Sequence, residues 1–368
     1  MPETPKRYPT AGKESNFNER GKMDTGIFKY ELPEELIADN PSERGTGKMM
    51  VLNREDNSIK HSDFSRFTDF IDERTTVVFN STKVIPARIF GQRASGGKVE
   101  FLLLKMLGGD VWQVMVKCSK HIGNGETVFF PNGLTAEIKE RNEQFAEAVF
   151  SENEDNLLKY LDKFGDIPLP PYILKKRGEK HSRPEDREKY QTVYAEVAGS
   201  VAAPTAGLHF SREIIEKTRE ITGGHIENVV LDVGLGTFLP VKSEKVEEHQ
   251  MHKEHFIIDE GTARRLNADK KAGRKILAIG TTTVRALESA AVAKGEIAPC
   301  DKETGIFIYP GYEYKFTDMI FTNFHLPCST LLMMISAFAG RDFVMEAYDA
   351  AVKNRYRFYS YGDSMLIL

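Results

Sequence analysis

The segment at residues 322–340, TNFHLPCSTLLMMISAFAG, constrains the fold more than any other part of the chain. Its second half is apolar on every face, which predicts a helix buried all round rather than one lying on a surface. Ser329 or Thr330 is a suitable N-cap, because a side-chain oxygen there accepts a hydrogen bond from an orphan backbone N–H. Asn323 and His325 then lie in a polar loop at a buried helix N-terminus, a position suited to holding an anion.

Length and composition indicate a globular protein with room for two domains. The chain has 368 residues, of which 40% are hydrophobic and 28% charged. The only long apolar run, residues 331–339, is too short to span a bilayer, and no apolar segment follows the first Met as in a secretory signal. Three widely spaced cysteines form neither a disulfide framework nor a zinc pattern, so we expect a reducing cytoplasmic setting. The net charge of −4 means that a nucleic-acid partner must meet a local basic patch.

Two textures along the chain predict two domains. Between residues 75 and 150, short strand-like runs beginning with TTVVFN alternate with Gly and Asn turn signals, which is typical of a small barrel or sandwich. From about residue 200, strands alternate with helical patterns, which is typical of layered α/β structure. We predict a mixed-sheet α/β main domain, which includes a strand at residues 48–52, interrupted by a smaller β-barrel. The predicted bounds are 1–24 for a disordered extension, 25–74 and 157–368 for the α/β domain, and 75–156 for the inserted barrel.

Cap and turn residues bound the elements of the α/β part. Each predicted helix ends at glycine, which tolerates the left-handed conformation common at a helix C-terminus. In chain order the elements are a helix capped by Ser211 that runs to about Glu220, strands at 225–233 and 275–279, and a helix at 284–294 closed by Gly295.

The segment at residues 168–191 carries the densest basic run in the chain. Charge runs are usually solvated linkers, and this is the first interpretation. The alternative is a flexible arm that grips phosphates. The basic residues are Lys175, Lys176, Arg177, Lys180, Arg183 and Arg187.

Two segments bring polar groups to element ends where chemistry is often placed. Residues 199–210 are small and flexible and end in His209, which could be a general base, a hydrogen-bond donor or a structural histidine. Residues 280–283, GTTT, follow a strand and open a helix, a geometry that aims N–H groups and hydroxyls at a carboxylate or phosphate. Arg285 and Glu288 follow on that helix, where an ordinary i,i+3 ion pair is the alternative to a binding role.

Two further motifs carry less information. Gly234, Gly236 and Thr237 form a second glycine turn after a strand, but the third glycine of a dinucleotide fingerprint is missing. The run HQMHKEH at residues 249–255 clusters His and Glu without the spacing of a known metal site, so we expect no metal.

Taken together, these segments resemble the S-adenosylmethionine:tRNA ribosyltransferase-isomerase family of the queuosine pathway. The resemblance spans nearly the whole chain after the extension, and its motifs are long and occur in the family's order. They are FKYELPEELIA, FNSTKVIPARIFG, GGKVEFLLL, YQTVYAEVAGSVAAPTAGLHF, VGLGTFLPVK, HQMHKE, AIGTTTVRALES, IYPGY, TNFHLPCSTLLMMISAFAG and YRFYSYGDSMLI.

The resemblance implies an α/β domain interrupted by a β-barrel and an unusual transfer reaction. S-adenosylmethionine would serve as co-substrate, and its ribosyl part would pass to 7-aminomethyl-7-deazaguanine at the tRNA wobble position. The ribose would rearrange to an epoxy-cyclopentane, giving epoxyqueuosine-tRNA while adenine and methionine leave. The partner would be tRNA carrying that base, with no membrane and no obligate protein partner.

Within this resemblance each candidate site residue has an expected role. The sulfonium acidifies the 5′ carbon, so a base must remove a proton there, and a neutral histidine suits pH 7. We expect His209 or His325 as base or acid, Thr281, Thr282 and Arg285 at the carboxylate, Glu288 at the ammonium, Asn323, Ser329 and Thr330 at ribose hydroxyls, and Gly234, Gly236 and Thr237 elsewhere around the cofactor. The expected RNA contacts are Lys83, Arg88, Arg93, Lys175, Lys176, Arg177 and Arg183.

Five residues depart from the family pattern. Asp232 stands where the family usually has His, which reverses the local charge preference. Gly47-Lys48 replaces Ser-Arg, Ser81 replaces Asp, and Ala286 replaces Thr. The alternatives are therefore a diverged paralogue with an altered substrate or no activity, and a non-catalytic tRNA-binding protein.

Overall fold

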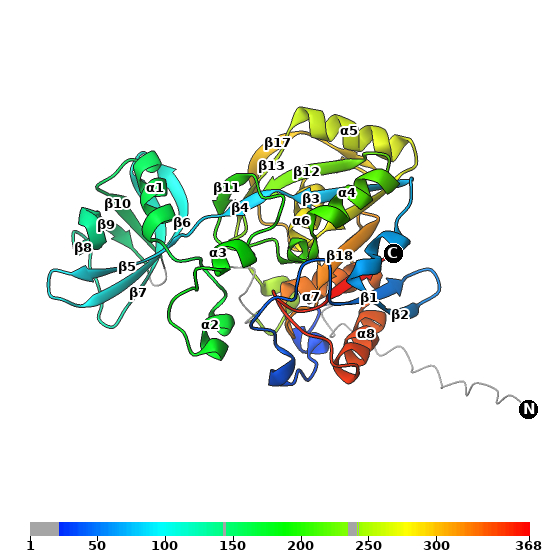
Figure 1. Ribbon diagram of the computed structural model, residues 1–368, viewed down its shortest axis with the longest axis horizontal. Helices are drawn as coiled ribbons and strands as arrows, with labels where there is room; N and C mark the ends of the chain where they lie inside the picture. The colour runs from blue at the N-terminus through cyan, green and yellow to red at the C-terminus, as the bar shows by residue number, and fades with distance from the viewer. Residues whose placement is uncertain (1–21, 143–144, 235–240, 242) are drawn as a thin grey trace, which may run out of the picture.

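The structure, a computed structural model, describes residues 22–142, 145–234, 241 and 243–368 (Figure 1). A large layered α/β body carries a closed β-barrel that projects to one side. This is the predicted fold class, a mixed-sheet α/β domain with a smaller barrel. In the described part, no helix is long and apolar enough to cross a membrane.

A nine-stranded mixed sheet forms the centre of the α/β body. Its middle strands β12, β3, β14 and β18 run parallel, and antiparallel pairings lie toward both edges. In spatial order the strands are β17 (Cys300–Thr304), β13 (Glu254–Ile258), β12 (Ile226–Leu231), β3 (Thr75–Asn80), β14 (Lys275–Ile279), β18 (Met319–Asn323), β19 (Ser364–Ile367), β1 (Lys48–Asn53) and β2 (Ser58–Asp63).

Helices cover both faces of this sheet because its middle strands are apolar on both sides. On one face Val78 and Ile276 pack in the same core as residues of four helices. On the other face the neighbouring Val77 and Leu277 pack with Phe64, Phe67 and Phe210. The helices of the first face are α5 (Glu260–Lys271), α6 (Thr281–Ala290), α7 (Thr330–Ala339) and α8 (Arg341–Lys353), and α4 (Arg212–Ile221) and the short helix η3 (Phe64–Phe70) lie on the second.

The helix ends follow the cap chemistry of the sequence, with one difference. Ser329 caps α7 by accepting a hydrogen bond from the Leu332 N–H at 3.2 Å, and Ser211 caps α4, as predicted. The predicted helix at residues 284–294 is wrong at both ends, because α6 begins at Thr281 and stops at Ala290. A short hairpin of β15 (Ala291–Ala293) and β16 (Glu296–Ile297) follows α6, and Gly295 lies in its turn with φ +76°.

The six barrel strands match the runs that the turn signals separate. Alternate side chains point inward, so that Val99, Phe101 and Leu103 lie in a barrel core of their own. Around the closed barrel the strands are β10 (Phe145–Phe150), β7 (Val111–Cys118), β6 (Lys98–Gly108), β5 (Arg88–Arg93), β8 (Thr127–Phe129) and β9 (Thr135–Arg141).

The predicted bounds of the barrel are wrong at both ends. Thr75–Asn80, expected to open the barrel, is β3 in the middle of the large sheet. All six residues of β3 are buried, as a central parallel strand covered on both faces requires, so its apolar run gave no sign of which sheet it joins. At the other end, Leu157 and Leu161 of α1 (Glu154–Phe164), expected in the main domain, lie in the barrel core.

The basic segment at residues 168–191 is folded, so both the solvated linker and the flexible arm are wrong as descriptions of its structure. It forms α2 (Pro171–Arg177) and α3 (Asp186–Lys189). Ile173, Leu174 and Tyr190 anchor it in a small core that it shares with other segments, including Val84 and Tyr361. In Figure 1 it lies between the barrel and the large sheet. Two short parallel strands, β4 (Thr82–Val84) and β11 (Val197–Ser200), join the two bodies.

Contact with the main domain begins before the predicted start at residue 25. Met23 is buried, and the Thr25 N–H donates to the Glu244 carbonyl at 2.9 Å. The rest of the predicted extension, residues 1–21, lies outside the described residues. Cys118, Cys300 and Cys328 are free.

Candidate active site

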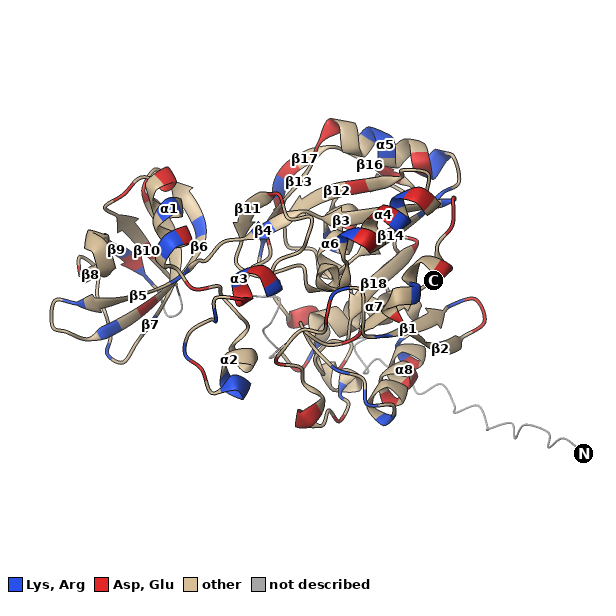
Figure 2. Ribbon diagram, in the orientation of Figure 1, with Lys and Arg blue, Asp and Glu red and all other residues tan. Residues whose placement is uncertain are grey.

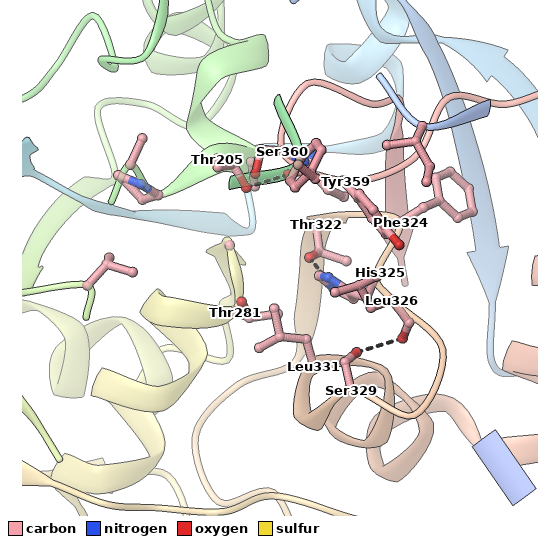
Figure 3. A pocket seen from close by; sticks show the side chains of 18 of the residues that line it. Thr205, Thr281, Thr322, Phe324, His325, Leu326, Ser329, Leu331, Tyr359 and Ser360 are labelled. Atoms are coloured by element: carbon pink, nitrogen blue, oxygen red, sulfur yellow. Dashed lines mark hydrogen bonds between the residues drawn. The ribbon is translucent and has the colours of Figure 1, made fainter. Parts of the chain in front are cut away.

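A cavity of about 650 Å³ opens at the carboxyl ends of β14 and β18 (Figure 3). Ligand sites in α/β sheets are usually found at this edge, and the volume lies within the range of small-molecule sites. The lining residues come from segments far apart in the sequence: Glu34, Ile37, Pro171, Tyr172, Lys175, Lys176, Ala203–Ala206, Val233, Gly280–Thr282, Thr322–Leu326, Ser329, Leu331, Tyr359 and Ser360.

The first turn of α6 forms one part of the cavity wall. Gly280 leaves β14 with φ +89°, a conformation that glycine adopts without strain, and the helix begins at the next residue. Thr281 and Thr282, which the sequence analysis expects at the co-substrate carboxylate, both line the cavity. No side chain caps this helix, so its first N–H groups remain suited to an anion.

The first turn of α7 meets the same cavity through Ser329 and Leu331. Ser329 Oγ accepts from its own helix and donates to the Leu326 carbonyl at 2.8 Å, so this hydroxyl is already hydrogen-bonded. Thr330, predicted to meet ribose, is buried and does not line the cavity. The N-termini of two helices thus converge on one space, which gives it a positive potential.

Asn323, the last residue of β18, joins the cavity to the histidine behind it. Its Oδ1 accepts from Thr205 Oγ1 at 3.1 Å, and its Nδ2 lies 3.1 Å from His209 Nε2. The His209 ring packs against Phe64 and Phe321 and does not line the cavity. Burial, with a smaller contribution from the charge of Arg357, lowers the pKa of His209 to about 4. His209 is therefore neutral near pH 7 and is placed to orient Asn323.

His325 lines the cavity directly. Its Nε2 lies 2.9 Å from Thr322 Oγ1 (Figure 3). Its backbone N–H donates to Tyr348 Oη at 2.8 Å, and its carbonyl accepts from Tyr30 Oη at 2.5 Å. Burial lowers the pKa of His325 to about 3, so the ring is neutral near pH 7. From the sequence, His209 and His325 are equal candidates for the base or acid. In the structure, only His325 lines the cavity.

Arg285 and Glu288 of α6 do not line the cavity. Glu288 accepts from the backbone N–H groups of residues 315–317 at 2.8–3.1 Å and from Tyr312 Oη at 3.1 Å. Arg285 is buried in an ion pair with Glu254, and burial lowers its pKa to about 10. The alternative prediction, an i,i+3 ion pair between Arg285 and Glu288, is therefore wrong. A co-substrate bound in this cavity therefore does not reach the side chains of Arg285 and Glu288 through the lining.

The glycine turn is only partly described. The Gly234 N–H donates to Glu254 Oε1 at 3.0 Å. Gly236 and Thr237 lie outside the described residues. Within the described part of the chain, no group of three or more His, Cys, Asp or Glu side chains could hold a metal ion.

Asp232, the main departure from the family pattern, lies outside the cavity lining. Its Oδ1 accepts from Thr82 Oγ1 at 3.0 Å, and its Oδ2 lies 3.3 Å from His255 Nδ1. Burial opposes a charge on His255, but hydrogen bonds to Asp301 and Asp232 outweigh burial and raise its pKa. The carboxylate at position 232 is thus matched to a histidine supplied by β13.

Two lysines expected to contact RNA lie in the cavity wall instead of on a remote surface. Lys175 and Lys176 project from the end of α2, where Figure 2 shows a concentration of positive charge. Lys176 Nζ donates to the carbonyls of Glu34 and Ile37 at 3.2 and 2.5 Å, which ties α2 to the short helix η2 (Glu34–Leu36). Lys175 is exposed, and its side chain makes no hydrogen bond or ion pair with the described residues.

Arg177, one of the predicted RNA contacts, is enclosed in the protein. Its side chain is 2% exposed and pairs with the fully buried Asp186 at 2.9 Å. Arg88 and Arg93 are ion-paired with Glu100 and Glu126 at 2.7 and 2.6 Å.

The remaining predicted RNA contacts are accessible. Arg183 is 40% exposed beside Glu179, and Lys83 is exposed. Both remain predicted RNA contacts.

Sequence reasoning missed Glu34, Tyr172, Thr205, Thr322 and Ser360 as cavity residues. Glu34 and Thr322 lie inside motifs that carried the family resemblance, which was the available signal. No local pattern connects either residue with a pocket, because the chain fold brings these segments together.

Comparison with known proteins gives one consistent result. A family model described as queuosine biosynthesis protein matches residues 25–367. Relatives named S-adenosylmethionine:tRNA ribosyltransferase-isomerase include proteins of Caldanaerobacter subterraneus subsp. tengcongensis and Acetivibrio thermocellus. Each is 47% identical to this chain over 94% of its length and 100% of the relative. The crystal structure of S-adenosylmethionine tRNA ribosyltransferase from Thermotoga maritima is similar with a TM-score of 0.51 and 34% identity, covering 93% of this chain and 100% of the other.

Proposed function

The chain belongs to the queuosine biosynthesis protein family, and on that premise we propose that it is an S-adenosylmethionine-dependent tRNA ribosyltransferase-isomerase that reacts in the cavity described above. It transfers the ribosyl moiety of S-adenosylmethionine to tRNA and isomerises it. The acceptor is 7-aminomethyl-7-deazaguanine at the wobble position, and the products are epoxyqueuosine-tRNA, adenine and methionine. Its place of action is the cytoplasm.

The observation that carries this proposal is the convergence of two helix N-termini and a neutral histidine on one cavity. The co-substrate has a carboxylate, and the uncapped first turn of α6 offers N–H groups for it. The hydroxyls of Thr281 and Thr282 support the same contact. Ser329 and Asn323, which are already hydrogen-bonded to the protein, present fixed polar groups to the ribose.

The ammonium of the methionine part needs a carboxylate. Glu34 is the only acidic residue that lines the cavity in the described part of the chain. Glu288, the residue expected to meet the ammonium from the sequence, accepts hydrogen bonds from four donors in residues 312–317 and does not line the cavity. We therefore assign the ammonium contact to Glu34.

His325 is the residue we assign to proton transfer. The positive sulfur acidifies the attached 5′ carbon, and the neutral imidazole has a lone pair to accept the proton. In this step the C–H bond breaks and an N–H bond forms, while the electron pair stays on the carbon beside the sulfonium. His209 contributes through Asn323, whose amide it contacts.

The tRNA approaches from the side of α2. Lys175 is exposed at the cavity wall, and Lys83 and Arg183 are accessible on the segments that join the two bodies. Phosphate contacts by such residues make RNA affinity dependent on salt.

The test is to mix the purified protein with S-adenosylmethionine and an anticodon stem-loop that carries the aminomethyl-deazaguanine, and to follow adenine release and RNA mass. We expect adenine and an RNA mass gain equal to the epoxy-cyclopentane adduct. Stem-loops carrying guanine at the same position serve as the control.

The two alternatives give different results in this assay. A non-catalytic tRNA-binding protein would bind the stem-loop equally well with and without S-adenosylmethionine and release no adenine. A paralogue with an altered substrate would bind S-adenosylmethionine but form no adduct with this base. Either result would overturn the proposed function.

A further inference from the structure

Thr322 occupies a fixed position beside the candidate base. It is buried in β18, which pairs with β14 on one side and β19 on the other, and its partner in β19 is Met365. The sheet therefore fixes the backbone that carries the hydroxyl. Thr322 Oγ1 makes its one hydrogen bond within the described residues to His325 Nε2, at 2.9 Å.

Two tyrosines fix the backbone of His325 independently of its ring. Tyr348 of α8 accepts from the N–H and Tyr30 of the N-terminal segment donates to the carbonyl. Both tyrosines are buried, and their rings pack edge to face at 5.1 Å. With the backbone held on both sides, the ring has little freedom to leave the Thr322 hydroxyl.

This arrangement leaves the second ring nitrogen for the cavity. His325 Nδ1 makes no hydrogen bond to the described residues. It is not one of the fully buried polar atoms without a partner in the described part of the chain, so it is accessible from the cavity. Thr322 and His325 both line the cavity and face each other in Figure 3. A ligand in the cavity therefore meets Nδ1 and not Nε2.

The charges around the cavity decide which nitrogen carries the proton of the neutral ring. The first turn of α6 and the ammonium groups of Lys175 and Lys176 present N–H groups or positive charge on the lining, and Glu34 is its one carboxylate among the described residues. An N–H bond at Nδ1 would point a further donor into this field, whereas a lone pair there is stabilised by it. The proton is then at Nε2, directed at the oxygen of Thr322.

We infer that Thr322 is a positioning residue that holds His325 in the Nε2–H tautomer and turns the Nδ1 lone pair toward the co-substrate. The inference rests on the proposed function, since it names the nitrogen that takes the proton from the 5′ carbon. Nδ1 gains that proton, and Nε2–H keeps its hydrogen bond to Thr322 Oγ1 while the ring is transiently positive.

The kinetic test compares Thr322→Val with Thr322→Ser. Valine keeps the shape but removes the hydroxyl, so we expect kcat for adenine release to fall on the order of 10-fold or more, with KM for S-adenosylmethionine unchanged. Serine keeps the hydroxyl and is expected to restore most of kcat. Thr317→Val is the matched control, because Thr317 Oγ1 is buried without a hydrogen-bond partner in the described residues and lies outside the lining.

Nitrogen NMR of ¹⁵N-histidine-labelled protein tests the tautomer directly, with His325 assigned by loss of its signals in His325→Gln. We expect Nε2 protonated and Nδ1 unprotonated in the wild type at pH 7, and a mixture of tautomers in Thr322→Val. An Nδ1-protonated ring would overturn the inference. So would a Thr322→Val enzyme as active as wild type in a series where His325→Gln is inactive.

Failure of the proposed function gives a different pattern. A wild type that releases no adenine, or a fully active His325→Gln variant, would reject the reaction or the base assignment. The NMR experiment would still decide whether Thr322 sets the tautomer. If Thr322→Val folds poorly, the protonation of Nε2 and Nδ1 in the wild-type spectrum remains the test.

Discussion

The cavity has two walls of opposite character. The inner wall is formed by residues 280–282, 322–326, 329 and 331 at the ends of β14 and β18. Its polar side chains are buried, and hydrogen bonds within the protein hold those of Thr322, Asn323 and Ser329. The outer wall is formed by η2 and α2, and there Glu34 and Lys175 are exposed. Proton transfer needs groups held in one geometry, whereas recognition of a large charged RNA needs accessible charge. We therefore assign chemistry to the inner wall and recognition to the outer wall.

The sharpest test of this division lies within the inner wall, between its two histidines. His325→Gln should lower adenine release at least about 100-fold, because it removes the proton acceptor at the cavity surface. His209→Gln should cost clearly less, since His209 acts only through Asn323. Single-turnover adenine release, with circular dichroism to confirm folding, measures both. Equal losses in the two folded variants would assign His209 a direct role and break the distinction.

A second test concerns the buried ion pair between Arg177 and Asp186, which supports α2 in the outer wall. Arg177→Met leaves the Asp186 carboxylate buried without its partner, so we expect the free energy of unfolding to fall by about 3–5 kcal/mol. The double variant Arg177→Met/Asp186→Leu should recover most of that loss, because no charge remains buried. Urea unfolding followed by circular dichroism measures the difference. Unchanged stability together with weaker RNA binding would return Arg177 to the predicted RNA contacts.

The smallest expected effect belongs to a single exposed charge of the outer wall. Lys175→Ala should weaken stem-loop binding less than about tenfold and reduce the slope of log K against log salt by about 0.7–0.9, as loss of one phosphate contact predicts. Lys271→Ala, an exposed lysine of α5 outside the lining, is the control and should change neither. Titration at several salt concentrations measures both. A loss of kcat at saturating RNA would place Lys175 with the inner wall.

The sequence predicted elements well wherever local signals decide them. Turn residues separate the barrel strands, and Ser329 and Ser211 cap their helices as expected. Local signals failed for β3, because an all-buried strand is apolar in either domain and only the pairing with β12 and β14 assigns it. The predicted C-terminal end of α6 was wrong for a similar reason. Residues 291–294, expected to continue the helix, instead belong to the hairpin whose pairing no local signal records.

The site could be predicted in part for the same physical reason. Thr281 and Thr282 lie in the first turn of α6 and reach the cavity, as a helix N-terminus after a strand predicts. Arg285 and Glu288 lie one and two turns further on and are carried into the protein interior. The cavity position of Glu34 depends on contacts between η2 and α2, about 140 residues apart, which no local pattern records.

The strand order also determines which domain can fold first during synthesis. The barrel is built from strands that lie close together in the chain, so it can form while later residues are still being made. The large sheet cannot, because β19 at residues 364–367 sits between β18 and β1 and joins them. Until residue 367 has left the ribosome, the strand that carries Thr322 lacks its neighbour on one side. The inner wall is thus completed last, and a nascent chain presents its barrel long before it can react.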